Sequence, residues 1–353
     1  MMSHLAMCSR SECNPGHKPP RLLISEQPSP YHLNMASSSQ LEFVTVDVFT
    51  SQPYGGNPLA IVRIPHDRTL TQEQKQTIAR EFNLSETTFL HENADGATED
   101  RWTVDIFMTS QELPFAGHPT VGTACYALGR TARERGIHSG VIEASFDLKA
   151  GCVGLRYDCG KMTAKASIPH DVHIHQRTFT KDELFALQSR LAEAHQEGKI
   201  GIKDDFAIVS IVKGMTFVLV ELESEEALGM VSLAGQSVKI QGLDPGWDQT
   251  FIGTYFFVRT GKSNESVTRL RTRMIEGPLE DPATGSAASD LAAYLSLKAE
   301  GGPKTLKYEI VQGVEMGRRS EIFIEVEMTE DRAVSQLFLE GGAVQVMEGR
   351  LTI

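Results

Sequence analysis

Alternating apolar and polar positions mark much of the chain after residue 40 as β-strand. Residues 41–49 read Leu-Glu-Phe-Val-Thr-Val-Asp-Val-Phe, in which β-branched and aromatic residues alternate with polar ones as they do in a half-buried strand. Comparable patterns predict strands at residues 58–64, 87–90, 101–107, 141–146, 153–157 and 161–168, and then at 206–212, 217–222, 249–258, 266–274, 307–312, 322–328 and 343–351.

Helical patterns separate these strands at a few places. Thr71 precedes Gln74, and Thr180 precedes Glu183, with the three-residue spacing of a capping box. This spacing predicts helices that extend to about residue 82 and about residue 197. A weaker helical pattern covers residues 224–233.

Two further helices are predicted to be buried, because small and apolar residues follow a turn in both. Residues 114–129 begin Pro-Phe-Ala-Gly-His, with Gly129 expected as the C-terminal cap, and residues 280–295 begin Glu-Asp-Pro-Ala-Thr-Gly-Ser. Each half of the chain has the same order of elements. It begins with strands and a short helix, and continues with more strands, a buried helix and further strands. An internal duplication of about 150 residues is therefore predicted. We expect similar halves at residues 41–168 and 175–353, with terminal strands that can exchange between them.

Residues 1–38 differ from the rest, since they are rich in Ser, His and Pro and carry no periodic apolar pattern. They lack the apolar stretch of a secretory signal, and Glu12 and Glu26 argue against a transit peptide. We interpret them as a disordered extension, or as the result of a start codon placed too early, with Met35 as the alternative start.

Composition and charge narrow the class of protein. Of the 353 residues, 41% are hydrophobic and 23% are charged, as in ordinary globular proteins. The net charge of -12 argues against nucleic-acid binding, which needs a basic face. No apolar run reaches the roughly 18 residues that span a bilayer, so no membrane partner is expected. The five cysteines include no Cys-x-x-Cys pair, which favours reduced thiols in the cytoplasm.

The two buried helices suggest where the chemistry lies. If their N-termini face one another, both dipoles favour an anion such as a substrate carboxylate. Glu86, His118, Asp281 and Ser286 stand near these positions, and apolar neighbours of Glu86 would raise its pKa toward the range of a proton shuttle. Each residue also has a purely structural interpretation. Glu86 would be a loop carboxylate, His118 a helix cap, Asp281 a partner of the helix dipole and Ser286 a helix-start hydroxyl.

Other signals are weaker. His173 and His175 have a His-x-His spacing that turns both imidazoles to one side of a strand, as metal ligands need. They lie between the two predicted halves without a nearby triad of acidic ligands, so we predict no metal site. Asn57 in Gly-Gly-Asn-Pro is most simply a turn residue, and Arg318 is either an anion contact or part of a surface hairpin. Walker A, Rossmann and Gly-x-Ser-x-Gly motifs do not occur.

From about residue 41 to its end, the chain resembles the PhzF-like proteins of phenazine biosynthesis, relatives of diaminopimelate epimerase. The matching motifs are Asp-Val-Phe-Thr at residues 47–50, Gly-Asn-Pro at 56–58, Ser-Glu-Thr at 85–87, Phe-Ala-Gly-His at 115–118, Glu-Asp-Pro-Ala-Thr-Gly-Ser at 280–286 and Gln-Gly-x-x-Met-Gly-Arg at 312–318. They occur in the family's order. One departure is Ser110, which stands where a proline is usual.

The resemblance implies an α+β protein with the diaminopimelate epimerase-like fold, in which each half is a β-barrel-like sheet around a central helix. It also implies an isomerase without cofactor or metal, commonly a homodimer, acting on a small carboxylate-bearing substrate. Glu86 corresponds to the family's acid/base. The substrate-binding positions are Asn57, Gly117, His118, Asp281, Thr284, Gly285 and Ser286.

The same resemblance argues against a two-thiol racemase. Diaminopimelate epimerase and proline racemase carry a cysteine at the head of each central helix, whereas Cys125 here lies about two turns into its helix and the second helix has none. We therefore expect an isomerase in which Glu86 moves a proton and thereby a double bond, with a role in a biosynthetic pathway. Two alternatives remain open, namely a one-base epimerase or racemase of an amino acid derivative and a non-catalytic binding protein on the same fold.

Overall fold

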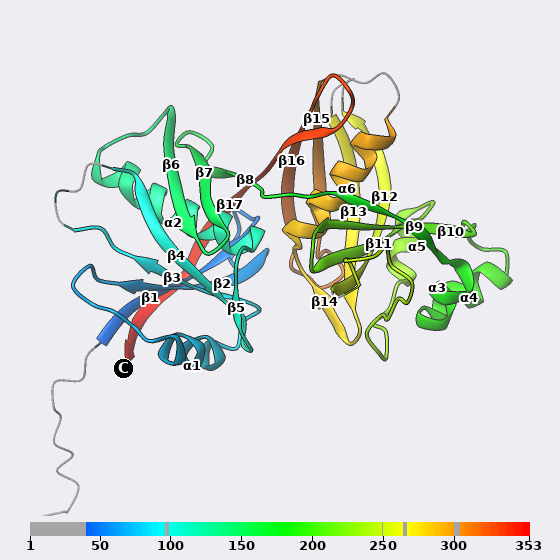
Figure 1. Cartoon of the computed structure of the whole chain (residues 1–353), viewed down its shortest axis with the longest axis horizontal. Coiled ribbons are helices and arrows are strands. Elements are labelled where there is room, and N and C mark those ends of the chain that lie inside the picture. Colours follow the sequence, from blue (N-terminus) through cyan, green and yellow to red (C-terminus); the bar gives the residue numbers. More distant parts are fainter. Residues whose placement is uncertain (1–39, 95, 97–98, 249, 264–266, 300–303) are drawn as a thin grey trace, which may run out of the picture. The chain divides into compact units, whose positions relative to one another are not determined.

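Two helices rich in small residues, α2 (Gly117–Glu134) and α6 (Gly285–Lys298), are each surrounded by strands in the computed structural model (Figure 1). The structure describes residues 40–94, 96, 99–248, 250–263, 267–299 and 304–353. The predicted extension at residues 1–38 lies outside these ranges. Among the described residues, no helix combines the length and the apolar composition needed to cross a membrane.

Strands of the first half form a closed ring around α2. Hydrogen-bonded pairs connect β17 to β1, then β2, β3, β4, β6, β7 and β8, and β8 pairs with β17 again. Their bounds are β1 Gln40–Val48, β2 Asn57–Ile64, β3 Thr87–His91, β4 Arg101–Phe107, β6 Val141–Leu148, β7 Gly151–Asp158, β8 Thr163–Ser167 and β17 Val334–Thr352. The closed ring has no free edge in the part of the chain described here.

The second half repeats this pairing around α6. Its strands connect in the order β9, β10, β11, β12, β13, β15, β16 and β17. Their bounds are β9 His173–Thr180, β10 Asp205–Val212, β11 Met215–Glu221, β12 Phe251–Ser263, β13 Val267–Glu276, β15 Thr305–Gln312 and β16 Ser320–Met328. The parallel pairs β2–β3 and β4–β6 recur as β11–β12 and β13–β15. The predicted fold, with two similar halves built around central helices, is confirmed.

The remaining elements are short. Helix α1 (Gln72–Phe82) begins at the predicted capping box of Thr71, and α5 (Glu225–Met230) follows β11. Two small strands, β5 (Glu112–Leu113) and β14 (Leu279–Asp281), lead toward the starts of α2 and α6. The helix predicted to reach residue 197 is instead two helices, α3 (Lys181–Leu187) and α4 (Ser189–Gln196), because Gln188 leaves the helical conformation and its amide bonds to Ser232.

The C-terminal strand is longer than its sequence pattern predicts. Instead of residues 343–351, β17 covers Val334–Thr352 as one strand. Its first part pairs with β16, its middle with β8 and its last part with β1. One continuous strand therefore contributes backbone hydrogen bonds to the sheets around both central helices.

The prediction that Gly129 ends the first buried helix is wrong. Helix α2 continues to Glu134, and the left-handed residue after it is Gly136, with φ of 66°. A Cβ at Gly129 would lie 3.2 Å from the hydroxyl oxygen of Tyr157. Gly129 thus permits close packing of α2 against β7 instead of ending the helix.

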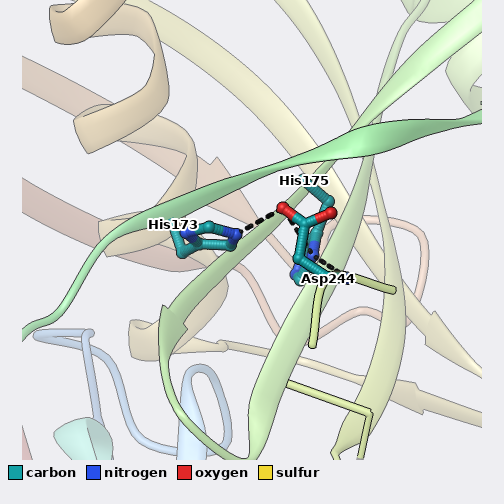
Figure 2. A group of neighbouring side chains, drawn as sticks. All are labelled: His173, His175 and Asp244. Atoms are coloured by element: carbon teal, nitrogen blue, oxygen red, sulfur yellow. Dashed lines mark hydrogen bonds and ion pairs between the residues drawn. The ribbon is translucent and has the colours of Figure 1, made fainter. Parts of the chain in front are cut away.

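The His-x-His pair has an acidic neighbour from a distant part of the chain, which its local sequence did not indicate. His173 and His175 lie on β9, and Asp244 comes from the segment between α5 and β12 to lie against them (Figure 2). The carboxylate is far away in the sequence, which explains why local spacing did not indicate it.

Candidate functional site

The two central helices begin next to each other. A Cβ on Gly117 would lie 3.6 Å from the Cα of Gly285, and a Cβ on either glycine would lie within 2.8 Å of the Leu339 side chain. The missing Cβ atoms leave room for the end of the Leu339 side chain between the two N-termini. Neither helix receives a side-chain hydrogen bond at its N-cap, so no capping side chain occupies the N–H groups of either first turn.

Glu86 and His118 form a close pair at the head of α2. Glu86 directly precedes β3, His118 is the second residue of α2, and Nδ1 of His118 lies 3.2 Å from Oε2 of Glu86. The side chain of Glu86 is 16% exposed and that of His118 is 6% exposed. The other imidazole nitrogen, Nε2 of His118, is buried without a hydrogen-bond partner among the described residues. That nitrogen has an unused capacity for one hydrogen bond.

The pKa of Glu86 moves in the direction opposite to the one expected. Burial is the largest influence and by itself would raise the pKa. The hydrogen bond from His118, its electrostatic attraction and the Ser85 hydroxyl together outweigh burial and lower the pKa. Glu86 is therefore a carboxylate at neutral pH, which is the form of a base and not of an acid.

Asp281, the last residue of β14, is the second carboxyl group of the site. Burial raises its pKa to about 6; the hydrogen bond from Thr284 opposes this rise, and the negative charge of Glu86 adds to it. His118 also acts on Asp281 electrostatically. The site thus combines residues from both halves of the chain, and the environments of its two carboxyl groups shift their pKa values in opposite directions.

Asp281 is held by hydrogen bonds to both carboxyl oxygens. The amide nitrogen of Asn57 donates to Oδ1 at 2.8 Å, and the hydroxyl of Thr284 donates to Oδ2 at 2.7 Å. Asn57 also donates to the carbonyl of Ala283 at 3.0 Å. Asn57 and Thr284, both expected to bind substrate, therefore bind the Asp281 loop directly.

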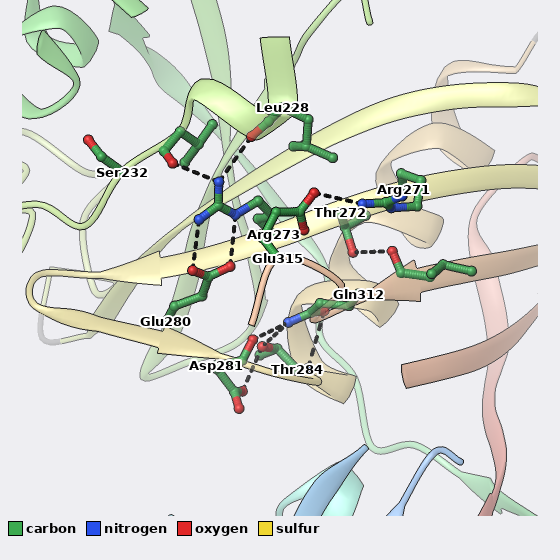
Figure 3. A network of polar contacts seen from close by, with 12 residues as sticks. Leu228, Ser232, Arg271, Thr272, Arg273, Glu280, Asp281, Thr284, Gln312 and Glu315 are labelled. Atoms are coloured by element: carbon green, nitrogen blue, oxygen red, sulfur yellow. Dashed lines mark hydrogen bonds and ion pairs between the residues drawn. The ribbon is translucent and has the colours of Figure 1, made fainter. Parts of the chain in front are cut away.

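Gln312, at the end of β15, is hydrogen bonded to the same loop (Figure 3). Its amide nitrogen donates to the carbonyl of Asp281 at 2.8 Å and to the Thr284 hydroxyl at 3.0 Å. Its amide oxygen accepts from the Thr284 N–H at 3.3 Å and from the hydroxyl of Tyr255 at 3.0 Å. Gln312 is fully buried, so these four bonds use most of its hydrogen-bonding capacity and leave the loop little freedom.

Arg273 anchors the acidic residue next to Asp281. Its guanidinium makes two hydrogen bonds of 2.8 Å to the carboxylate of Glu280, and it also donates to the carbonyls of Leu228 and Val231 (Figure 3). Glu280 is therefore a structural partner of Arg273, which joins β13, β14 and the end of α5.

Arg318 is also a structural residue. It donates to the carboxylate of Asp47 at 2.7 Å and to the carbonyls of Gly55 and Gly56 at 2.8 Å. Gly56 has φ of 60°, and a Cβ there would lie 2.1 Å from the carbonyl oxygen of Val48, so this tight turn requires glycine. The role considered for Arg318 as an anion contact is not supported, because its guanidinium positions the turn that carries Asn57.

The structure brings Asn57, Glu86, Gly117, His118, Asp281, Thr284 and Gly285 into one connected set of contacts. Ser286 is half-buried in the first turn of α6, and its hydroxyl makes no hydrogen bond within the described part of the chain. Sequence reasoning did not identify Gln312, Tyr255 and Arg273 as part of the site. Gln312 begins a motif that was recognised, whereas Tyr255 and Arg273 lie in ordinary strand patterns that give no signal.

Cys125 lies away from this chemistry. Its thiol is buried within α2 and donates to the carbonyl of Gly341 at 3.4 Å. Burial raises its pKa to about 12, so the thiolate is not formed at neutral pH.

Comparison with known proteins places the chain among isomerases. The family described as phenazine biosynthesis-like protein (PhzC-PhzF) matches residues 46–349. The chain is 32% identical over 315 residues to the trans-2,3-dihydro-3-hydroxyanthranilate isomerase of Pseudomonas aeruginosa, covering 87% of this chain and 98% of that protein. It is also 32% identical over 316 residues to an uncharacterized isomerase of Mesorhizobium japonicum, covering 88% and 98%.

Solved structures show the same fold. A PhzF-family protein of Bacillus anthracis aligns with a TM-score of 0.65 at 21% identity, covering 89% of this chain and 100% of that one. A hydroxyproline epimerase of Agrobacterium vitis aligns with a TM-score of 0.52 at 12% identity, covering 89% and 93%. The fold and the relatives define an isomerase built on duplicated barrels. The chain belongs to the phenazine biosynthesis-like (PhzC-PhzF) family.

Proposed function

We propose that this isomerase moves a double bond within a small carboxylate-bearing substrate, and that Glu86 transfers the proton. The observation that carries the proposal is the Glu86–His118 pair at the head of α2, with 3.2 Å between Nδ1 and Oε2, in the electrostatic environment of Asp281. A general base needs to be deprotonated and held in position, and this pair meets both conditions.

The proposed reaction is a balanced proton transfer. The Glu86 carboxylate removes a proton from a carbon whose C–H is acidified by neighbouring unsaturation, and the electrons of that bond shift the double bond. The neutral Glu86 then returns the proton to a different carbon, so that oxidation state and composition are unchanged. His118 keeps the carboxylate oriented through Nδ1, and its unpaired Nε2 is proposed to contact a polar group of the substrate.

The substrate carboxylate is proposed to bind where α2 and α6 begin. Support comes from the closeness of the two N-termini at Gly117 and Gly285, and from the half-buried hydroxyl of Ser286 in the first turn of α6. We assign Asp281 to substrate positioning on the side opposite Glu86. Asn57 and Thr284 act through the hydrogen bonds that hold this carboxyl group.

A cytoplasmic homodimer with a biosynthetic role stays a prediction. Cys125, Cys152 and Cys159 are free thiols in the described structure, in keeping with a reducing compartment. Light scattering coupled to size-exclusion chromatography measures the molar mass directly. A mass near 38.8 kDa would contradict the homodimer.

The decisive test of the reaction is isotope labelling in D₂O, followed by NMR. The first substrate to try is trans-2,3-dihydro-3-hydroxyanthranilate, because relatives 32% and 31% identical to this chain are isomerases of that compound. If it is turned over, a double-bond isomerase adds hydrogen to a carbon that was unsaturated in the substrate, and this carbon carries solvent deuterium to the extent that the proton on Glu86 exchanges before it is returned. Deuterium at the original carbon with inverted configuration would instead establish the one-base epimerase. If this compound is inert, the same readout is applied to a panel of unsaturated and amino-substituted carboxylates.

A further inference from the structure

A second cluster of ligand-type side chains lies on β9 and the segment that follows α5. The imidazoles of His173 and His175 are two residues apart on β9 and therefore lie on one side of the strand, with ring centroids 4.8 Å apart. Asp244 adds a carboxylate to the same place (Figure 2). None of the three residues belongs to the site that contains Glu86.

The spacing of the three ligand atoms suits one small cation. Oδ2 of Asp244 lies 2.7 Å from Nε2 of His173 and 3.9 Å from Nδ1 of His175, and all three atoms lie within 4.8 Å of one another. Tetrahedral zinc with bonds of about 2.1 Å separates its ligand atoms by about 3.4 Å. The two observed distances from Asp244 lie on either side of this value, so small side-chain rotations are sufficient to enclose an ion.

His175 is fixed in the tautomer that a metal ligand needs. Its Nε2 lies 2.9 Å from the Ser210 hydroxyl, which continues through the hydroxyls of Thr216 and Thr250 to the carbonyl oxygen of Phe251. A carbonyl can only accept, so each hydroxyl in this chain donates toward it and Nε2 of His175 carries the proton. The lone pair is therefore on Nδ1, where it accepts a long bond of 3.3 Å from the N–H of Asp244. Metal-bound histidines in proteins are oriented by such a hydrogen bond from the other nitrogen.

The other two ligands are also oriented from outside. The His173 ring stacks on Trp247, with 4.6 Å between centroids and 10° between planes, and Oδ1 of Asp244 accepts from the N–H of Gln176 at 3.4 Å. The ammonium of Lys213 lies over Trp247 at 5.6 Å and is the nearby charge that opposes a cation. The side chain of His175 is fully buried, whereas that of His173 is 32% exposed, so an ion could enter from the His173 side and keep a water ligand.

We propose that His173, His175 and Asp244 bind one divalent transition-metal ion of the zinc type, through two imidazole nitrogens and one carboxylate oxygen. The ion would link β9 to the segment between α5 and β12, and so hold a long connection against the sheet around α6. The inference does not depend on the proposed isomerase reaction.

The test is metal binding by the full-length protein, produced without a histidine tag and freed of metal by a chelator that is then removed. We expect one equivalent of Zn²⁺ to bind in a calorimetric titration, and zinc to raise the Tm because it binds only the folded state. His173→Ala, which changes the most exposed ligand, should weaken the affinity by at least about tenfold and remove the rise in Tm. Asp244→Asn preserves the shape of the side chain and should weaken zinc binding in the same way.

Two further variants distinguish a metal site from a structural cluster. His138→Ala removes an exposed histidine outside the cluster and should leave the zinc affinity unchanged. Ser210→Ala removes only the orienting hydrogen bond and should weaken zinc binding by about tenfold. The proposal is overturned if the wild type retains no zinc, or if His173→Ala and Asp244→Asn bind zinc as tightly as the wild type.

Discussion

The N-termini of α2 and α6, called here the first and the second head, occupy matching places in the duplicated fold. Their polar side chains nevertheless have different hydrogen-bond partners. At α2, Glu86 contacts His118, and Nε2 of His118 has no partner in the described structure. At α6, both carboxyl oxygens and the carbonyl of Asp281 are hydrogen bonded by Asn57, Thr284 and Gln312. At the first head an imidazole nitrogen has no partner, whereas at the second head three residues of the protein hold the Asp281 loop.

This difference suggests how a duplicated scaffold can support an asymmetric reaction. Duplication places two helix N-termini side by side, which suits an anion without specifying what is done to it. The surroundings then shift the pKa values of the two carboxyl groups in opposite directions. The contact with His118 lowers the pKa of Glu86, and burial raises the pKa of Asp281. We interpret the first head as the place of proton transfer and the second as a rigid support.

The largest effect is expected from Glu86→Gln, which retains the size of the side chain and removes the base. The catalytic rate should fall by about 10²- to 10⁴-fold, the usual contribution of general acid–base catalysis. Steady-state kinetics on a substrate identified by the labelling experiment measures this loss. Glu81→Gln changes an exposed glutamate of α1 and serves as the matched control. Retention of the wild-type rate by Glu86→Gln would refute the proton-transfer role.

Gln312→Ala tests whether the second head is a support. The substitution removes four buried hydrogen bonds, so the free energy of unfolding should fall by about 3 kcal/mol and KM should rise because the Asp281 loop is loosened. Urea denaturation and steady-state kinetics measure the two effects. Gln236→Ala, an exposed glutamine in the segment before β12, is the control. Unchanged stability and KM in Gln312→Ala would show that the loop needs no such support.

Asp281→Asn should change how stability depends on pH. The folded pKa of Asp281 is about 6 and the unfolded value is 3.8, so the folded state binds the proton more tightly. The wild type therefore has the full contribution of this group below pH 4 and loses it as the pH rises through 6, by about 3 kcal/mol for a shift of about two pH units.

The asparagine variant lacks this titration. Between pH 4 and pH 7, its free energy of unfolding should improve relative to the wild type by up to about 3 kcal/mol. Thermal unfolding across this pH range measures the difference. A constant difference between the two proteins over the whole range would show that burial does not shift the pKa of Asp281.

Cys125→Ala should have the smallest effect on catalysis. The thiol is buried and hydrogen bonded to the Gly341 carbonyl, and its raised pKa keeps it protonated. We expect kcat to stay within about twofold, with a loss of about 1 kcal/mol in stability from the small cavity and the missing bond. A strong loss of kcat with intact folding would mean that the thiol takes part in the reaction.

Much of the fold was predictable because strand periodicity and capping boxes are local signals. The caps at Thr71 and Thr180, the strand at Arg101–Phe107 and the two buried helices lie where the pattern placed them. Errors arose where a distant contact decides the local structure. Gly129 lies within a helix, where its missing Cβ leaves room for Tyr157, and Gln188 interrupts a helix where its side chain bonds to Ser232.

The candidate site also has features that local motifs indicated and features that depend on distant contacts. Short motifs indicated Glu86, His118 and Asp281 as candidates, but they indicated neither the direction of the Glu86 pKa shift nor the partners of Asn57 and Arg318. Those properties depend on partners from other parts of the chain, such as Asp281 for Asn57 and Asp47 for Arg318. The carboxylate beside His173 and His175 was missed for the same reason.

The sequence by itself determined the strands, the two small-residue helices, the duplication and the residue types near the helix starts, because each depends on composition and spacing within a short segment. Only the tertiary structure decided which side chains meet, which hydrogen bonds remain open and which pKa values rise or fall. These quantities depend on burial and on charges a few ångströms away in space, contributed by segments distant along the chain. At both helix N-termini and at the proposed metal site, the partners of the polar side chains come from such distant segments.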